Sequence, residues 1–396
     1  MTRPSLVFYC QHSLGLGHLT RSWSVAEALS SHFRVTLWCG GPLPEGLTPP
    51  ASCEIVALPP IVVDEEGRLV SLDSRYPVET ALEVRRDTML RCLATERPAA
   101  VVIELFPFGR RKFERELRPL LEAAQSSSPR PVVVCSLRDI LVGRGDRQVE
   151  HDERARMLVD RYFDAVLVHA DPAFARLDEF FWPRQPMRTP VHYTGFVTGG
   201  PSLESGSDRT GILVSGGGGR FAGPLFMTAV EAYGRLTDAP GLTVVAGPLC
   251  DGSTWQQLVT ATRDHPSIRL RPSVKDLSAE MAASRLSISQ CGYNTALDIV
   301  RARVPALVVP FAERGETEQT DRARRLRALG VLRVLSSERL NAATLAAAIE
   351  EVLGFAPAPV ALDLNGAERT THLLRALVEG AKPAGDRRMT FHEHLA

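Results

Sequence analysis

Residues 289–319 read SQCGYNTALDIVRARVPALVVPFAERGETEQ and combine a loop, a helix, a buried strand and a second loop. The run Ala306–Val309 is continuously apolar, which is typical of a parallel strand that is covered on both faces. Ahead of this strand, Gly292 ends a strand-to-helix loop, and Asn294 is a suitable N-cap for a helix that ends at about Ala302. The stretch therefore predicts one βαβ unit of a doubly wound sheet.

The same alternation of short apolar runs and helical segments continues in both directions along the chain. Downstream, a helix is predicted from Thr317 to Leu329, with Gly330 as the residue that ends it. Near the N-terminus, a helix is predicted from about His18 to Ser30, because apolar residues recur there at helical spacing. Strands are predicted in the first half at Leu6–Cys10, Val35–Trp38, Ile55–Leu58, Val101–Ile103, Val132–Cys135 and Ala165–Val168, and in the second half at Gly211–Ser215, Thr243–Ala246, Ile268–Leu270, Leu286–Ile288, Ala306–Val309 and Val331–Leu335.

A polar segment rich in Gly and Ser, TGGPSLESGSD at residues 198–208, separates two halves that share this plan. We expect an N-terminal Rossmann-like domain at residues 1–198, a linker at 199–210 and a C-terminal Rossmann-like domain at 211–365. Residues 366–396 would form a C-terminal helix and tail that could pack back on the N-terminal domain. The fold class is therefore α/β, with two doubly wound parallel-sheet domains facing a cleft. Ligands bind such sheets at the C-terminal ends of the strands, so the cleft is the expected active site.

Composition restricts the classes of function. Lys and Arg total 46, as do Asp and Glu, so the formal net charge is zero, which argues against a general nucleic-acid-binding protein. The seven cysteines include no C-x-x-C pair, and the apolar run after Arg3 is too short for a signal sequence, so we expect a cytoplasmic protein with reduced thiols. No cluster of His, Cys and Asp has metal-ligand spacing, so neither a metal nor another cofactor is expected. No long basic amphipathic patch is present, and membrane contact should be at most peripheral.

The first candidate motif is Gly15-Leu-Gly-His18, after the first predicted strand. Gly17 allows a ligand to approach the backbone closely. His18 lies at the start of a helix, whose positive end lowers a histidine pKa, and a neutral imidazole can act as a general base. The alternatives are a dinucleotide-binding loop or a plain turn. The dinucleotide fingerprint fails because Thr20 occupies the position of its third glycine.

The second candidate motif is Ser215-Gly216-Gly217-Gly218-Gly219-Arg220, at the start of the second half. Backbone N–H groups in such a run can cradle a phosphate, and Arg220 could add a charged contact. The P-loop pattern is absent, which argues against a kinase or ATPase of that class. The alternative is a flexible turn.

The third candidate site lies within residues 289–319. Asn294 and Thr295 are expected at a helix N-terminus that favours phosphate oxygens. Asp298 lies about one turn further on and could accept hydrogen bonds from a ribose diol, or could merely stabilise the helix dipole. Glu318 and Gln319 follow the next strand and are expected to contact the sugar hydroxyls.

Together these motifs resemble the GT-B glycosyltransferases of family 28, most strongly from Ser289 to Gly330. That family has a glycine loop, an acidic residue on the next helix, the pattern P-A-L-x-V-P-F and a loop that ends in glutamine. The resemblance implies that Asp298 contacts the ribose and Gln319 the sugar, although the family usually has Glu in place of Asp298. It also implies that Val274 lies in a segment whose backbone binds the nucleotide base, and that His18 activates the acceptor.

The N-terminal half is similar to a group of bacterial predicted glycosyltransferases, through QHSLGLGHLTR at residues 11–21, ELFPFGR at 104–110, CSLRDIL at 135–141 and YTGFV at 193–197. If this likeness holds, the acceptor side is lined by His12, Arg21, Glu104, Arg110, Arg138 and Asp139. Arg138 and Asp139 could equally form a structural ion pair.

The function implied is an inverting, metal-independent transfer of a sugar from a nucleotide diphosphate sugar, UDP more than another, to an acceptor hydroxyl or amine. A soluble small-molecule acceptor is weakly favoured, no nucleic acid is expected, and the sequence does not reveal the oligomeric state. Two alternatives stay open: a nucleotide-sugar 2-epimerase of the same fold, and a non-catalytic protein that binds a nucleotide sugar.

Overall fold

The computed structural model describes residues 3–13, 15–43, 47–64, 66–199, 209–312 and 317–380. These residues form two compact units. Unit 1 extends to Gly199 and also contains the segment from Leu362 onward, whereas unit 2 contains the chain from Gly200 to Ala361. Most of the expected linker, residues 200–208, and the tail at residues 381–396 lie outside the described residues.

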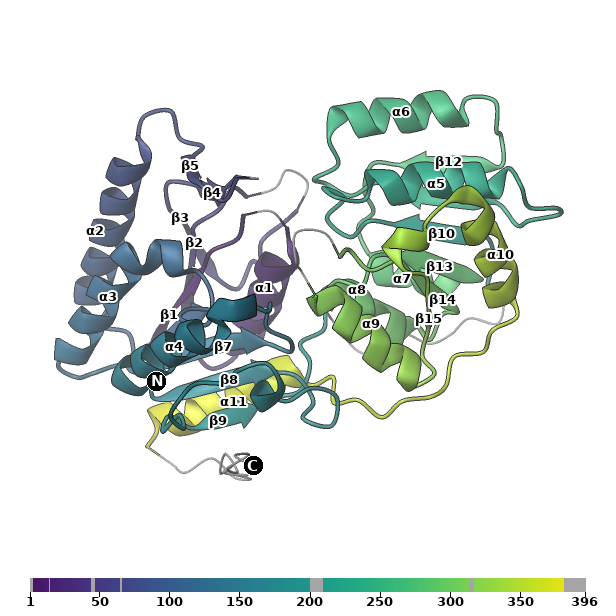
Figure 1. Ribbon diagram of the computed structural model, residues 1–396. Helices are drawn as coiled ribbons and strands as arrows, with labels where there is room; N and C mark the ends of the chain where they lie inside the picture. Colours follow the sequence, from purple (N-terminus) through teal and green to yellow (C-terminus); the bar gives the residue numbers. More distant parts are fainter. Residues whose placement is uncertain are drawn as a thin grey trace. The chain divides into compact units, whose positions relative to one another are not determined.

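The described part of unit 1 contains a seven-stranded parallel sheet with the order β3-β2-β1-β6-β7-β8-β9. Its central strands are apolar and fully buried, as expected for a sheet covered on both faces (Figure 1). The strands are β1 (Ser5–Cys10), β2 (Arg34–Cys39), β3 (Glu54–Ala57), β6 (Ala100–Glu104), β7 (Val132–Arg138), β8 (Ala165–His169) and β9 (Val191–Tyr193).

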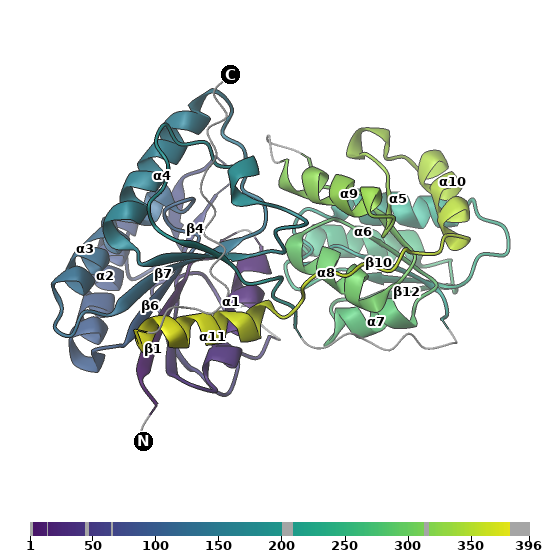
Figure 2. The ribbon, with the colours of Figure 1, turned by 90° about the horizontal axis from the view of Figure 1, so that it is seen from below.

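Helices and a small hairpin surround this sheet. The helices of unit 1 are α1 (Gly17–Leu29), α2 (Val78–Glu96), α3 (Glu114–Ser126), α4 (Gln148–Tyr162) and α11 (Gly366–Val378), and the antiparallel hairpin consists of β4 (Ile61–Val63) and β5 (Leu69–Ser71). Helix α11 packs beside α1 (Figure 2), and its Leu374 is fully buried in the same core cluster as Trp23. The Phe196 N–H donates to the carbonyl of Asp363 at 2.7 Å, which ties the segment before α11 to unit 1.

The described part of unit 2 contains a six-stranded parallel sheet with the order β12-β11-β10-β13-β14-β15. Its strands are β10 (Ile212–Ser215), β11 (Leu242–Val245), β12 (Ile268–Arg271), β13 (Leu286–Ser289), β14 (Ala306–Val308) and β15 (Arg333–Val334). Its helices are α5 (Gly223–Tyr233), α6 (Gly252–Thr262), α7 (Leu277–Ala283), α8 (Tyr293–Ala302), α9 (Glu318–Ala328) and α10 (Ala342–Leu353). One apolar core joins α5 and α10 to the sheet.

The predicted α/β class and the predicted strands are confirmed, since each predicted strand coincides with an observed one. The hairpin β4–β5 and the strand β9 were not predicted, because each of these strands has only three residues. The N-cap prediction at Asn294 is wrong. Helix α8 already begins at Tyr293, with Gly292 at the N-cap, so Asn294 lies inside the first turn. Gly330 has φ of +72° directly after the end of α9, as predicted for a residue that ends a helix.

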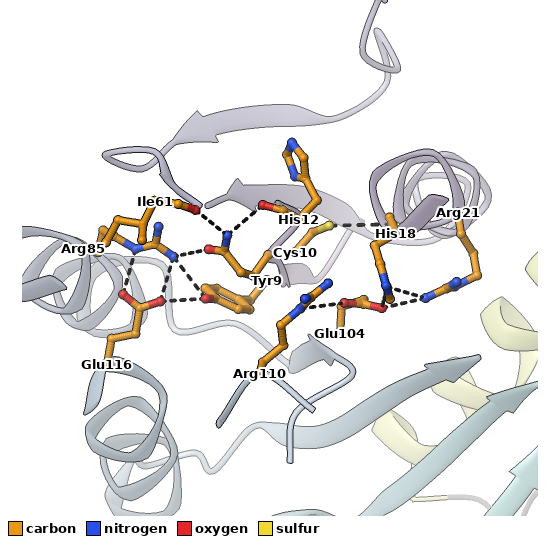
Figure 3. Close-up of polar contacts among 11 residues, drawn as sticks. Tyr9, Cys10, His12, His18, Arg21, Ile61, Arg85, Glu104, Arg110 and Glu116 are labelled. Atoms are coloured by element: carbon orange, nitrogen blue, oxygen red, sulfur yellow. Dashed lines mark hydrogen bonds and ion pairs between the residues drawn. The ribbon is translucent and has the colours of Figure 1, made fainter. Parts of the chain in front are cut away.

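A fully buried ionic network joins α2 and α3 to the ends of β1 and β2 (Figure 3). Arg85 donates to both carboxylate oxygens of Glu116 at 2.8 Å, to the side-chain oxygen of Gln11 at 2.6 Å and to the carbonyl of Gly40 at 2.7 Å. The Tyr9 hydroxyl donates to Glu116 at 2.6 Å. A Cβ atom on Gly40 would lie 2.2 Å from Gln11 Oε1, so only glycine fits there. The network therefore sets the loop that follows β1.

Candidate functional site

Both sheets have a topological switch point, where the chain reverses its direction of travel across the sheet. In unit 1 it lies between β1 and β6, and in unit 2 between β10 and β13. Doubly wound sheets bind ligands at this point, outside the carboxyl ends of the strands. The loops after these four strands contain most of the residues that the sequence singles out, so each unit has its own candidate site.

In unit 1, His18 and Glu104 form a close pair (Figure 3). His18 is the second residue of α1, and its Nδ1 lies 2.6 Å from Oε1 of Glu104, the last residue of β6. Arg21, one turn along α1, donates to the same oxygen at 2.6 Å. Glu104 and Arg21 are buried, whereas the His18 side chain is 17% exposed. The structure thus places Glu104 and Arg21 against His18, which keeps an exposed edge.

The electrostatics of this pair determine the histidine tautomer. Burial alone would raise the pKa of the Glu104 carboxyl, but the hydrogen bond from His18 and the charges of Arg21 and Arg110 outweigh it and lower that pKa to about 2. Burial lowers the pKa of His18 to about 3 and outweighs the opposing effect of the Glu104 carboxylate, and the charge of Arg110 adds a smaller lowering contribution. An ionised carboxylate can only accept hydrogen bonds, so His18 carries its proton on Nδ1. Its Nε2 is then a lone-pair acceptor, which is the form a general base needs.

The other predicted acceptor-side residues lie around this pair. Arg110 follows β6 in a left-handed backbone conformation, with φ of +59°, and its Nε lies 4.0 Å from Glu104 Oε2. His12 follows β1 and is buried, and its Nε2 lies 2.7 Å from the carbonyl of Pro42. Arg138 ends β7 and is half-buried, and its charge contributes to the lowered pKa of His18. Asp139 is buried beside it in the sequence.

A second buried histidine, His169, was not identified from the sequence. It ends β8, and its Nε2 lies 2.8 Å from the hydroxyl of Ser136, which pairs in register with Glu104. Its Nδ1 lies 2.8 Å from the hydroxyl of Thr194. Burial lowers the pKa of His169 to about 3, helped by the charge of Arg21. His169 is therefore a neutral group that supports the strand ends behind Glu104. Its position at the end of the apolar run of β8 is the feature of the sequence from which it could have been identified.

In unit 2, the glycine loop after β10 packs against the loop after β11. A Cβ atom on Gly219 would lie 2.2 Å from the carbonyl oxygen of Ala246, and the Leu249 N–H donates to the carbonyl of Gly218 at 2.8 Å. Gly217 and Gly219 have φ of +59° and +92°, which favour glycine. Gly216 is equally constrained, since a Cβ there would lie 2.3 Å from that of Ala222. This loop is a packed, shaped turn, unlike the flexible turn that was the alternative interpretation.

The N-terminal turn of α8 lies beside this glycine loop. A Cβ atom built on Gly217 would lie 3.3 Å from the hydroxyl oxygen of Thr295. The N-cap residue of α8 is Gly292, which has no side chain that could cap the first N–H groups of the helix. The buried hydroxyl of Ser215 also makes no hydrogen bond within the part of the chain that is described. The structure thus brings Ser215, Gly216, Gly217, Gly292 and Thr295 together at one helix N-terminus, with Asn294 in the same turn.

Gln319 links two loops of unit 2. Its side-chain oxygen accepts hydrogen bonds from the N–H groups of Cys291, at 3.0 Å, and Phe311, at 3.1 Å. The oxygen is therefore committed to the protein, and its side-chain NH₂ group is the part that could contact a sugar. Glu318, the first residue of α9, is buried. Arg220 is exposed and lies near Phe221, whose ring stacks on that of Phe311 with the centroids 5.1 Å apart.

The remaining two donor-site candidates, Asp298 and Val274, lie on α8 and in the loop between β12 and α7. Asp298 is on α8, and its carboxylate lies 3.5 Å from Nη1 of Arg301, which also lies 3.4 Å from the Ser278 hydroxyl on α7. Burial raises the pKa of Asp298 to about 7, against the opposing effect of Arg301. Val274 is half-buried in the loop between β12 and α7.

Two features are absent from the described residues. No helix among them is long and apolar enough to cross a membrane. Within the same residues, no group of three or more His, Cys, Asp or Glu side chains is arranged to hold a metal ion.

Sequence comparison relates the C-terminal part of the chain to a known family. Residues 244–369 match the family described as the Glycosyltransferase family 28 C-terminal domain. Over 172 residues the chain is 24% identical to the UDP-N-acetylglucosamine–N-acetylmuramyl-(pentapeptide) pyrophosphoryl-undecaprenol N-acetylglucosamine transferase of Lactococcus lactis subsp. cremoris strain MG1363. That match covers 41% of this chain and 48% of the relative, so the chain spans about half the length of the relative it matches.

Two solved structures resemble the fold over nearly the whole chain. MurG of Acinetobacter baumannii has a TM-score of 0.56 and 15% identity, with 97% of each chain covered. A Listeria monocytogenes protein assigned as a UDP-N-acetylglucosamine 2-epimerase has a TM-score of 0.60 and 12% identity, covering 98% of this chain and 100% of that one. At these identities the likeness concerns the fold.

Two Rossmann-like units, each with a candidate ligand site at its switch point, define a protein of the GT-B class. Within that class, residues 244–369 match the C-terminal domain of glycosyltransferase family 28, and the relative from Lactococcus lactis is similar over part of the chain. The resemblance deduced from the sequence motifs is thereby confirmed.

Proposed function

We propose that this protein is a glycosyltransferase that moves a sugar from a nucleotide diphosphate sugar to an acceptor hydroxyl or amine. Unit 2 binds the donor and unit 1 binds the acceptor. The observation that carries the proposal is the hydrogen bond between His18 and Glu104, which leaves His18 Nε2 as a base at the switch point of unit 1. The donor side rests on the family match, which covers residues 244–369.

In the proposed reaction, His18 Nε2 removes the proton from the acceptor oxygen as that oxygen attacks the anomeric carbon of the donor. The bond between this carbon and the diphosphate breaks, so the configuration inverts and the nucleoside diphosphate leaves. Glu104 holds the imidazole in place and stabilises the imidazolium that forms, as carboxylates do in other histidine dyads. Backbone N–H groups of the glycine loop and of the first turn of α8 stabilise the charge on the leaving group without a metal.

UDP is favoured as the nucleotide because the Lactococcus relative is named as a transferase of UDP-N-acetylglucosamine. Binding to the native protein should raise its melting temperature, and a panel of UDP, GDP and TDP species compares the nucleotides directly. If none of the three raises the melting temperature, the donor site is not where we place it. The acceptor is proposed to be a small molecule reached from the cytoplasm.

A nucleotide-sugar 2-epimerase is the second candidate, favoured by the likeness to the Listeria protein. Incubation with UDP-N-acetylglucosamine alone separates the two activities, because an epimerase forms a new UDP-sugar and a transferase releases only UDP by slow hydrolysis. A protein that binds the donor but yields neither product, with any acceptor of a broad panel, would be a non-catalytic binder.

The proposed ribose contact predicts a pH dependence of donor binding. Because burial raises the pKa of Asp298 to about 7, the unliganded carboxyl is largely protonated at pH 6 and largely ionised at pH 8. The ionised form accepts hydrogen bonds from both ribose hydroxyls, so the affinity for UDP-glucose should rise about tenfold from pH 6 to pH 8. Calorimetric titration at both pH values measures this change. The Asp298→Asn variant should bind weakly and equally at both, and a wild-type affinity that falls with pH would contradict the contact.

A further inference from the structure

The surroundings of His18 contain more positive than negative charge. Two acids, Glu104 on β6 and the buried Asp139 after β7, are set against three arginines, namely Arg21 on α1, Arg110 after β6 and Arg138 at the end of β7. The whole chain has a formal net charge of zero, so this is a local excess. Buried charge of one sign is stable when a partner of the opposite sign occupies the site.

Arg110 is the cation that the protein itself uses least. Its side chain is 17% exposed, and its buried Nε makes no hydrogen bond to any described residue. The nearest carboxylate oxygen, Glu104 Oε2, lies 4.0 Å away and also makes no hydrogen bond in the described chain. Arg110 and Glu104 therefore form a long ion pair, without the short paired hydrogen bonds that an arginine and a carboxylate normally make.

The backbone keeps Arg110 in this position. Its φ of +59° is a left-handed conformation that costs energy for a residue with a side chain, and such strain persists where the surroundings impose it. The Arg110 carbonyl accepts a hydrogen bond from Phe113 N–H at 2.8 Å, and the Gly109 N–H donates to the Leu105 carbonyl at 3.0 Å. Both bonds anchor the loop on either side of Arg110.

His12 adds a hydrogen-bond acceptor to the same place. Its Nε2 lies 2.7 Å from the Pro42 carbonyl, an acceptor only, so Nε2 carries the proton. Its Nδ1 is then a lone pair, which is buried and has no hydrogen-bond partner among the described residues. Figure 3 shows Arg110 beside the His18–Glu104 pair, and His12 on the loop after β1 with its ring turned away from Arg110. The loops after β1 and β6, together with the start of α1, thus offer a charged donor, a neutral acceptor and a base.

We infer that the acceptor is a hydroxylated acid, whose carboxylate or phosphate group binds Arg110 and whose bound charge activates His18. The inference rests on the proposed function. A hydroxyl of the same molecule would donate to His12 Nδ1. The negative charge of the acid offsets the field of Arg110, which otherwise disfavours a proton on His18. His18 is then a weak base in the free protein and a stronger one only when the correct acceptor is bound.

The experiment measures the protonation of His18 by NMR of the imidazole in the full-length protein, with the signal assigned by its loss in His18→Gln. The probes are glucose 6-phosphate, glucuronate and uncharged glucose, so that a phosphate, a carboxylate and a neutral molecule are compared. One or both acids should raise the His18 protonation constant by about tenfold or more, and glucose should leave it unchanged. The acid that acts identifies the class of anion.

Two variants show whether Arg110 is responsible. Arg110→Gln should abolish the response to the acids, and Arg110→Lys, which keeps the charge, should retain part of it. Arg115→Gln is the matched control, because this arginine is 72% exposed and pairs with an exposed Glu79. The inference is overturned if neither acid changes the protonation constant of His18. It is also overturned if the acids change this constant as much in Arg110→Gln as in the wild type.

The result is separable from the proposed function. If UDP-sugars bind and turn over while neither acid changes the protonation of His18, the transferase proposal is supported and the proposal of an acidic acceptor is rejected. If His18 responds to an acid while no nucleotide sugar binds, unit 1 still has the anion site and the transfer proposal fails.

Discussion

Replacement of His18 with Gln should lower kcat for sugar transfer by about 10²–10⁴-fold, which is the usual contribution of a general base. The substitution removes the Nε2 lone pair that accepts the acceptor proton, whereas the proposed donor site lies in unit 2. Donor affinity, measured by calorimetric titration of the nucleotide sugar, should therefore stay the same. Transfer itself is measured under saturating donor with quantification of the glycosylated product.

Two further variants make this test specific. Glu104→Gln keeps the shape of the partner but replaces an acceptor-only carboxylate with a neutral amide, whose NH₂ group can donate to Nδ1 and favour the other tautomer, so a loss of similar order is expected. His32→Gln is the control, because His32 lies just beyond the opposite end of α1 and should leave kcat unaltered. If His18→Gln retains more than about a tenth of the wild-type kcat, His18 is not the base.

The fold could be predicted because its information is local. Most strands at the centre of each sheet contain continuous apolar runs that are buried on both faces, and such runs are visible without any knowledge of contacts. The hairpin β4–β5 and the strand β9 have no such signature, since they are short and only partly buried. Their existence depends on neighbours distant in sequence, such as the pairing of β9 with β8.

The individual motifs of the candidate site could be predicted from the sequence, but the contacts between residues of different motifs could not. Glycine loops and the position of His18 at a helix start can be recognised from spacing. His18 and Glu104 are separated by 86 positions in the chain. They meet because β1, which precedes His18, lies beside β6 in the sheet. The two hydrogen bonds that the Gln319 oxygen accepts from the backbone of Cys291 and Phe311 were likewise not visible in the sequence, while its contact with the sugar stays a prediction. Contacts of this kind are set by topology and cannot be deduced from one segment.

Arg85→Met should destabilise unit 1 by about 3–5 kcal/mol, because it leaves the buried carboxylate of Glu116 without its cation. Methionine preserves much of the volume of the side chain, so the loss reports on the charge and its hydrogen bonds. Three of those bonds reach Gln11 in the loop after β1 and the carbonyls of Gly40 and Pro59 in the loops after β2 and β3. The variant should therefore lose stability, and the loop that holds His12 should be less well fixed.

Urea unfolding followed by tryptophan fluorescence measures this loss for unit 1 alone if Trp255, the one tryptophan of unit 2, is first replaced with Phe. The other three tryptophans, Trp23, Trp38 and Trp182, all belong to unit 1. Arg115→Met in the same background is the control, since its ion pair with Glu79 is exposed on both sides and is worth about 0–1 kcal/mol. Equal losses in the two variants would mean that burial does not distinguish the pairs. In that case the Arg85 network cannot be what holds the loop of His12 in place.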